Sequence, residues 1–148
     1  MTKKEALRFF DNQPIVILST IGPDGTPQTR ALVNVRNKNI SPNLIEYFKK
    51  TDRIFLMTNT HTDKIREMHV NPAASIYMYD NEFNGMLLTG AVAEITDDKI
   101  KDAIWDDSLT HYYPSGRRGG DFSVIEFVPK TFKTYNGADF HKEQGDVM

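Results

Sequence analysis

The sequence predicts a mainly β domain: an antiparallel barrel or strongly curved sheet with short helices at its periphery. Short β-branched or alternating runs recur along the chain, and most of them follow one another through turn residues instead of alternating with crossover helices. In addition, no Gly-x-Gly-x-x-Gly stands between a strand and a helix in the right place. A doubly wound α/β fold is therefore not expected.

The expected strands begin with a hairpin. The dense turn chemistry of Gly22-Pro-Asp-Gly-Thr-Pro27 separates two runs, and in the second run Arg30, Leu32 and Asn34 alternate with residues that point the other way. The segment 130–135 is a further candidate strand. The strands are expected at 15–21, 28–36, 53–59, 73–79, 86–95 and 123–128.

Helical spacing of apolar residues and start and stop signals predict the helices. The segment 112–120 is expected to be a loop, and the tail from residue 138 is expected to be loose. The helices are expected at 3–11, 41–50, about 63–70 and 96–105.

Composition bounds the class of protein. A length of 148 residues is typical of a single domain. The chain has 39% hydrophobic and 26% charged residues, as is usual for a globular protein, and a net charge of −2. This charge gives no attraction for nucleic acid or an anionic membrane surface. The absence of cysteine excludes disulfides, iron–sulfur clusters and a thiol nucleophile. The N-terminus lacks an apolar signal core and no run is long enough for a membrane span, so we expect a cytoplasmic protein.

The histidines and carboxylates do not predict a metal site or a catalytic pair. His61 and His69 are eight residues apart, His111 and His141 are isolated, and no Gly-x-Ser-x-Gly is present. The segment Gly116-Arg-Arg-Gly-Gly120 has two interpretations, an anion cradle or a charged surface loop, and the second is the simpler.

The stretch FLMTNTHTDKIREMH, residues 55–69, also has two interpretations. It predicts a strand that leads through hydroxyl and amide side chains into a helix, so the polar residues either cap the helix or form an anion site with its free N–H groups and Lys64. If the strand that carries Arg30 lies near the strand ending at Asn59, then Arg30, Thr58, Thr62 and Lys64 converge. Such a cluster is suited to a phosphate dianion.

These motifs resemble those of a known family. DGTPQTR (24–30), NVRN (34–37), TNTHTDKIREMHVNP (58–72), NEFNGMLLTG (81–90) and IWDDSLTHYYPSG (104–116) occur in the order typical of the pyridoxamine 5'-phosphate oxidase-like FMN-binding split-barrel superfamily. Within it, the chain is similar to the general stress protein 26 type. The resemblance covers about residues 6–135 and implies a single domain with a six-stranded split barrel, a homodimer and FMN at the subunit interface.

The resemblance also assigns a cofactor site. It implies that Arg30 and Lys64 bind the FMN phosphate with the hydroxyls of Thr58 and Thr62, next to Asn59. The same resemblance places the flavin ring along the remaining residues, which are Ala31, Leu32, Val33, Asn34 and Met57. With this implication the phosphate interpretation of residues 55–69 is favoured over the helix cap.

Departures from the family pattern argue against pyridoxamine phosphate oxidase activity. Asp63 and Gly85 stand where the oxidases commonly carry arginine and glutamine, and their C-terminal Arg and His segment has no counterpart after Pro129. We expect an FMN-dependent oxidoreductase with no assigned catalytic residue, because hydride transfer to a flavin chiefly requires stacking geometry. The alternatives are a non-enzymatic flavin-binding stress-response protein, a deazaflavin or haem protein, or a scaffold that only dimerises.

Overall fold

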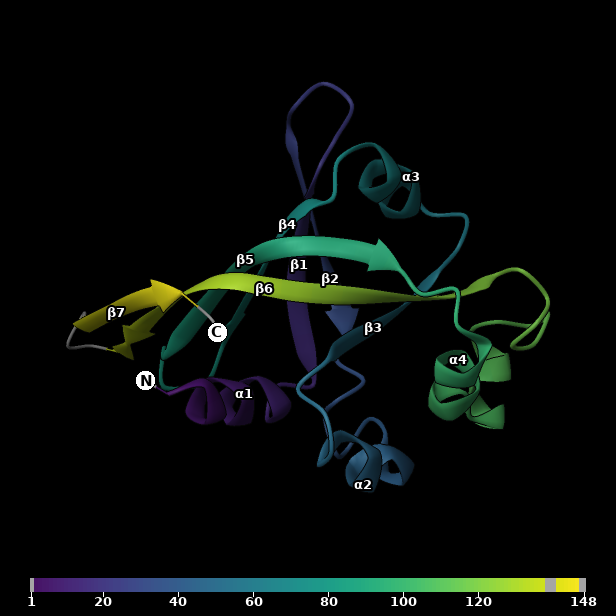
Figure 1. Cartoon of the computed structure of the whole chain (residues 1–148), viewed down its shortest axis with the longest axis horizontal. Coiled ribbons are helices and arrows are strands. Elements are labelled where there is room, and N and C mark those ends of the chain that lie inside the picture. Colours follow the sequence, from purple (N-terminus) through teal and green to yellow (C-terminus); the bar gives the residue numbers. More distant parts are fainter. Residues whose placement is uncertain (1, 138–140, 147–148) are drawn as a thin grey trace.

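A strongly curved antiparallel sheet dominates the computed structural model, which describes residues 2–137 and 141–146 (Figure 1). The α-helices are α1 (Lys3–Asp11), α2 (Ile45–Phe48), α3 (Asp63–Val70) and α4 (Asp98–Ile104), and 3₁₀ turns span Pro42–Leu44 and Asp107–His111. The strands are β1 (Ile15–Ile21), β2 (Pro27–Val33), β3 (Ile54–Asn59), β4 (Ala73–Tyr79), β5 (Gly85–Glu94), β6 (Phe122–Asn136) and β7 (His141–Asp146).

The strand order makes the sheet a split barrel. It runs β2-β1-β4-β5-β6-β3, every pairing is antiparallel, and β7 pairs with β6. The two ends of this path meet at an isolated bridge between Asn34 and Leu56. The predicted barrel class is therefore confirmed, and so is the expected proximity of the strand that carries Arg30 to the strand that ends at Asn59.

The C-terminal part of the chain differs from the sequence expectation in two ways. The predicted strands 123–128 and 130–135 are one strand, β6, which continues through Pro129 because a bulge in β6 leaves Lys130 unpaired where the register shifts between Thr89 and Gly90 of β5. A Cβ at Gly90 would lie 2.0 Å from the Val128 carbonyl oxygen, so the close approach of the strands requires glycine. Residues 141–146 of the predicted loose tail form β7, while residues 138–140 and 147–148 lie outside the described residues.

Two apolar clusters hold the elements together. The larger one fills the curved sheet and includes Phe10 of α1 and Ile65 and Met68 of α3, the two residues predicted on the inner face of that helix. Figure 1 shows α1 and α3 at opposite ends of the sheet. The second cluster packs Phe48 and Ile104, from α2 and α4, against the outer side of β3 and β6. No helix in the described part of the chain is both long and apolar enough to span a membrane.

Candidate functional site

A charged cluster lies where β2, β1 and α3 meet. Arg30 of β2 donates hydrogen bonds to the Thr20 hydroxyl over 2.6 Å and to a Glu67 carboxylate oxygen over 3.1 Å. Thr20 in turn donates to the same Glu67 oxygen. Thr20 is fully buried and Glu67 nearly so, whereas the Arg30 side chain keeps 23% of its surface exposed. Thr20 and Glu67 thus hold the guanidinium in place and leave part of it open.

Lys64 completes this cluster. Only 7% of its surface is exposed, and burial followed by the nearby Arg30 charge lowers the pKa of its ammonium group, against the opposing effect of Glu67 and Asp63. Across residues 2–137 and 141–146, no atom accepts a hydrogen bond from this ammonium. A cation on a largely buried side chain, partly desolvated and without a protein acceptor, is unfavourable, so the geometry fits an anionic ligand.

Thr58 and Thr62, the two threonines predicted to bind phosphate before α3, differ in their contacts. Thr62 is the N-cap residue, but its hydroxyl donates to the Asn59 carbonyl over 2.8 Å and makes no capping bond to α3. Asn59 accepts a hydrogen bond from the His61 N–H instead. Thr58 is buried, and its hydroxyl has no partner in the described segments. The Ile65 amide donates to the Thr62 carbonyl over 3.3 Å, so the amides of Asp63 and Lys64 and the Thr58 hydroxyl remain available for phosphate oxygens.

Asp63 does not compete for this cluster. Its side chain is 75% exposed and forms an ion pair with Arg66 one turn along α3. Asp63 acts on Lys64 from a distance, but its charge is balanced by Arg66, which leaves Arg30 and Lys64 against the carboxylate of Glu67. This excess of positive charge at a helix N-terminus fits a phosphate dianion.

The other predicted site residues separate into inner and outer positions. Leu32 packs against the core inside the sheet, and Ala31 on the opposite face of β2 is exposed. Val33 and Met57 are half-buried on the outer side of β2 and β3. The outer face of these strands is thus a surface along which a flat ring has room to lie.

Asn34 supports the fold. It is fully buried, and its amide donates 2.8 Å hydrogen bonds to the carbonyls of Phe10 and Gln13 while its side-chain oxygen accepts from the Arg36 N–H. Its side chain therefore fixes the end of β2 against α1 and is not available to a ligand.

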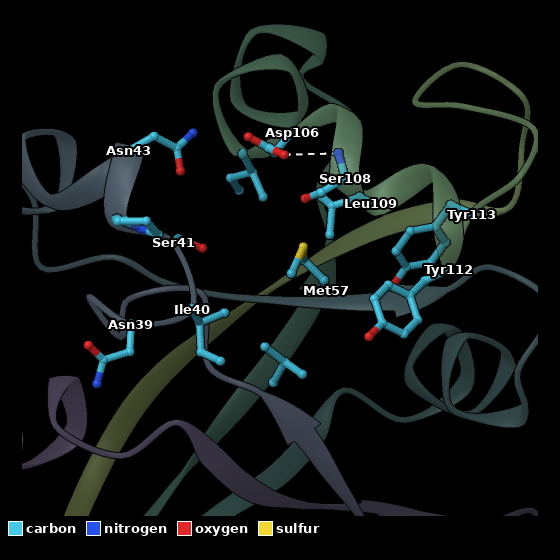
Figure 2. A pocket seen from close by; sticks show the side chains of 13 residues that line it. Asn39, Ile40, Ser41, Asn43, Met57, Asp106, Ser108, Leu109, Tyr112 and Tyr113 are labelled. Atoms are coloured by element: carbon cyan, nitrogen blue, oxygen red, sulfur yellow. Dashed lines mark hydrogen bonds between the residues drawn. The ribbon is translucent and has the colours of Figure 1, made fainter.

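A cavity of about 550 Å³ adjoins Val33 and Met57. Its other walls come from the segment before α2 and from the segment that follows α4, which face each other across it (Figure 2). The lining residues are Val33, Asn39, Ile40, Ser41, Pro42, Asn43, Met57, Ile104, Asp106, Ser108, Leu109, Tyr112 and Tyr113. The volume is typical of a small-molecule site.

Sequence reasoning missed Thr20, Glu67 and the two cavity segments. Glu67 lies three residues after Lys64, and this spacing places both side chains on one face of α3, so helical periodicity could have found it. Thr20 carried only a weak signal, a polar residue at the end of an apolar run. The cavity segments carried no signal, because loops far apart in sequence form it.

The Gly116–Gly120 loop and the histidines were the other candidate binding features in the sequence. In the Gly116–Gly120 loop, Arg118 forms ion pairs with Asp98 and Asp102 of α4, at 2.7 and 2.8 Å, so this guanidinium is not free for an anion. Within the described ranges, no group of three His, Cys, Asp or Glu residues could hold a metal ion.

Comparison with family models decides the identification. The model described as pyridoxamine 5'-phosphate oxidase matches residues 2–136. This chain belongs to the pyridoxamine 5'-phosphate oxidase family. A comparison with curated protein sequences gives no significant match.

Solved structures share the fold of this family member. A Clostridium acetobutylicum protein related to general stress protein 26 is 21% identical, with 99% and 97% of the two chains covered and a TM-score of 0.77. An FMN-binding protein from Nostoc punctiforme is 15% identical over 99% and 93%, with a TM-score of 0.63. A haem-binding protein from Mycobacterium smegmatis is 15% identical over 97% and 57%, with a TM-score of 0.68.

One departure from the oxidase pattern has a steric reason. A Cβ at Gly85 would lie 2.6 Å from the Tyr77 hydroxyl on the neighbouring strand β4. Glutamine at this position in this pyridoxamine 5'-phosphate oxidase family member would require the exposed end of the Tyr77 side chain to shift.

Proposed function

We propose that this protein binds FMN through its phosphate and acts as an FMN-dependent oxidoreductase. The observation that carries the proposal is the largely buried Lys64 side chain, whose partly desolvated ammonium lies beside Arg30 and has no acceptor in the described residues. The phosphate would accept hydrogen bonds from Arg30, Lys64, the Thr58 hydroxyl and the amides of Asp63 and Lys64, and from the Thr62 hydroxyl once it turns away from the Asn59 carbonyl. Family membership and a fold shared with an FMN-binding protein support the cofactor.

The chain's residues would bind and orient the cofactor, and bound FMN would supply hydride chemistry. The ring would lie along the outer side of β2 and β3, from Ala31 to Asn34 and against Met57. Leu32 and the Asn34 amide would act from inside by fixing β2, since both lie within the fold. No proton transfer by a side chain is needed, so we assign no catalytic acid or base.

A homodimer with FMN at the subunit interface is part of this proposal. β2 is an edge of the sheet path with an exposed outer face, and stacked Tyr77 and Tyr79 with half-exposed Ile15 extend this surface. Burial of such apolar side chains favours association. Sedimentation at micromolar concentration is expected to give a dimer, and a monomer would contradict the shared site. The cytoplasmic location stays a prediction.

The alternative is a binding protein without turnover that holds a flavin, a deazaflavin or haem. The shared fold with a haem-binding protein motivates the last of these. Haem offers two singly charged propionates, whereas two cations at a helix N-terminus match the dianionic charge of one phosphate, so the Arg30 and Lys64 cluster favours a phosphorylated cofactor over haem.

The visible spectrum of the purified protein, before and after addition of FMN, tests the proposal. A flavin spectrum that shifts and stays with the protein through gel filtration is expected, followed by bleaching on addition of NADH or NADPH. Retained FMN that is reduced no faster than free FMN would favour the carrier. A Soret band, or failure to retain FMN, would contradict the assignment of the cofactor.

A further inference from the structure

The cavity beside Val33 and Met57 differs in chemistry from the Arg30 and Lys64 cluster. Its apolar walls are made by aliphatic, methionine and tyrosine side chains, and no Lys, Arg or His is among the described residues that line it. Its one charged lining residue is Asp106, which accepts a hydrogen bond from the Ser108 N–H over 2.9 Å. The cavity therefore offers no counter-charge to an anion and places a carboxylate at its rim.

Asp106 is ionised at neutral pH. The hydrogen bonds from Ser108 lower the pKa of its carboxyl group below the ordinary value for aspartate. A phosphorylated or carboxylated ring would meet this negative charge with no cation among the lining residues. Pyridoxamine phosphate thus fits the cavity poorly, in agreement with the departures at Asp63 and Gly85.

Tyr113 gives the cavity a directed hydrogen-bond donor. The residue is 9% exposed, and its ring packs edge-on against Phe122 at 5.1 Å and tilted against Trp105 at 6.5 Å between centroids. Its hydroxyl has no partner in the part of the chain that the structure describes. Figure 2 shows Tyr112 and Tyr113 on one side of the cavity with their hydroxyl ends turned toward it.

The Tyr113 hydroxyl is protonated at neutral pH. Burial, and then the charge of Asp121, raise the pKa of this group above the ordinary value for tyrosine. The hydroxyl oxygen is not among the fully buried polar atoms, so it opens to the cavity, and a ligand that brings an acceptor atom would take its hydrogen bond. A carbonyl oxygen is the uncharged group that serves this purpose best.

We propose that this cavity binds an uncharged flat ring that carries a carbonyl oxygen, held by the Tyr113 hydroxyl and the apolar walls. The position of the ring beside the flavin rests on the proposed function, because Val33 and Met57 belong both to the cavity and to the predicted flavin site. A free carbonyl compound and the carboxamide-bearing ring of a nicotinamide cofactor share this chemistry.

The test is titration of the purified full-length protein, saturated with FMN, with 1,4-naphthoquinone and with 1,4-naphthoquinone-2-sulfonate. The chain has no cysteine, so the probes meet no thiol, and it has a single tryptophan, Trp105, which contacts Tyr113 and reports binding by fluorescence. Calorimetry gives an independent affinity. Saturable binding of the quinone is expected, with the sulfonate about two- to fivefold weaker, because the Asp106 carboxylate at the rim is exposed and solvent screens its repulsion.

Two variants assign the interactions. Tyr113→Phe is expected to weaken quinone binding by about three- to tenfold, the net effect of one neutral hydrogen bond, and Tyr135→Phe on β6 is the matched control. Asp106→Asn keeps an acceptor for the Ser108 N–H, and it is expected to improve sulfonate binding several-fold while quinone binding stays the same. Equal affinities for the two probes, or unchanged quinone binding in Tyr113→Phe, would overturn the proposal.

FMN released during the quinone titration, and competition by NADH, distinguish the other possible occupants of the cavity. One FMN released for each quinone bound would show that the cavity holds the flavin ring itself, and this also overturns the proposal. A protein that fails to retain FMN refutes the proposed function, but the titrations still decide the cavity's ligand class. Competition by NADH would identify a nicotinamide ring as the occupant, and lack of competition a free carbonyl compound; either result agrees with the proposed chemistry.

Discussion

Arg30 and Arg36 are six residues apart, and both contact a carboxylate, yet their surroundings differ. Arg36 has a side chain that is 2% exposed, and it donates five hydrogen bonds: two to the Asp11 carboxylate and three to the carbonyls of Phe48, Thr51 and Arg53. Arg30 donates to Thr20 and Glu67 only and lies beside a lysine without an acceptor.

The difference separates a structural charge from a binding charge. Arg36 ties α1, the end of α2 and the approach to β3 together, and the Phe48 ring covers its guanidinium at 4.8 Å. All of its hydrogen-bonding capacity serves the fold. The Arg30 cluster retains unmet donors and an excess of positive charge, which the fold alone does not require.

The largest expected effect tests the structural side. Arg36→Ala should lower the free energy of unfolding by about 3–5 kcal/mol, because the Asp11 carboxylate and three carbonyls lose their donor. Urea denaturation measures it. Arg53→Ala is the control, since that side chain is 44% exposed in its pair with Glu126 and should cost at most about 1 kcal/mol. Equal losses of unfolding free energy in Arg36→Ala and Arg53→Ala would show that Arg36 is no more important for the fold than an exposed arginine.

The next effect tests the binding side. Replacement of both Arg30 and Lys64 by alanine should weaken FMN about 100-fold or more, because two charge-assisted interactions with the phosphate are lost. Riboflavin, which lacks the phosphate, should change by less than about threefold. Flavin fluorescence titrations with both ligands provide the comparison, and similar losses for both would show that these residues do not bind the phosphate.

A smaller effect of the opposite sign sharpens the contrast. In the protein freed of FMN, Lys64→Met should raise the free energy of unfolding by about 1 kcal/mol, because it removes a buried ammonium without an acceptor. The pKa of Lys64 is lowered in the folded state. The charged Lys64 ammonium therefore lowers the free energy of unfolding by its full amount at pH values below the folded-state pKa. This destabilisation disappears as the pH rises to the ordinary pKa of lysine. A destabilised variant at neutral pH would contradict this.

The smallest effect concerns the carboxylate in the cluster. Glu67→Gln keeps an acceptor for Thr20 and Arg30 and removes one negative charge near the phosphate, so FMN affinity should rise about two- to fivefold at neutral pH. Riboflavin affinity should not change, and Glu126→Gln on β6 serves as a control distant in sequence. A fall in FMN affinity would instead assign Glu67 to the positioning of Arg30.

Much of this architecture was predictable, and the exceptions have physical causes. The hairpin of β1 and β2, the β3-to-α3 connection and the inner face of α3 follow from turn residues and periodicity. β6 was predicted as two strands because Pro129 breaks a regular ladder, and the strand continues only through a bulge at its own Lys130, opposite Thr89 and Gly90. β7 was missed because its sequence is polar, and its order comes from pairing with β6.

By itself, the sequence determined the local elements and the motifs that place the chain in its family, because turn chemistry, caps and periodicity act over a few residues. It also identified Arg30 and Lys64 as candidate ligands of a phosphate group. Only the tertiary structure decided which charges are satisfied. Thr20 and Glu67 reach Arg30 across 10 and 37 residues of sequence, and the cavity joins loops from both halves of the chain. Such contacts depend on how the sheet curves, a property of the whole packed chain and not of any one segment.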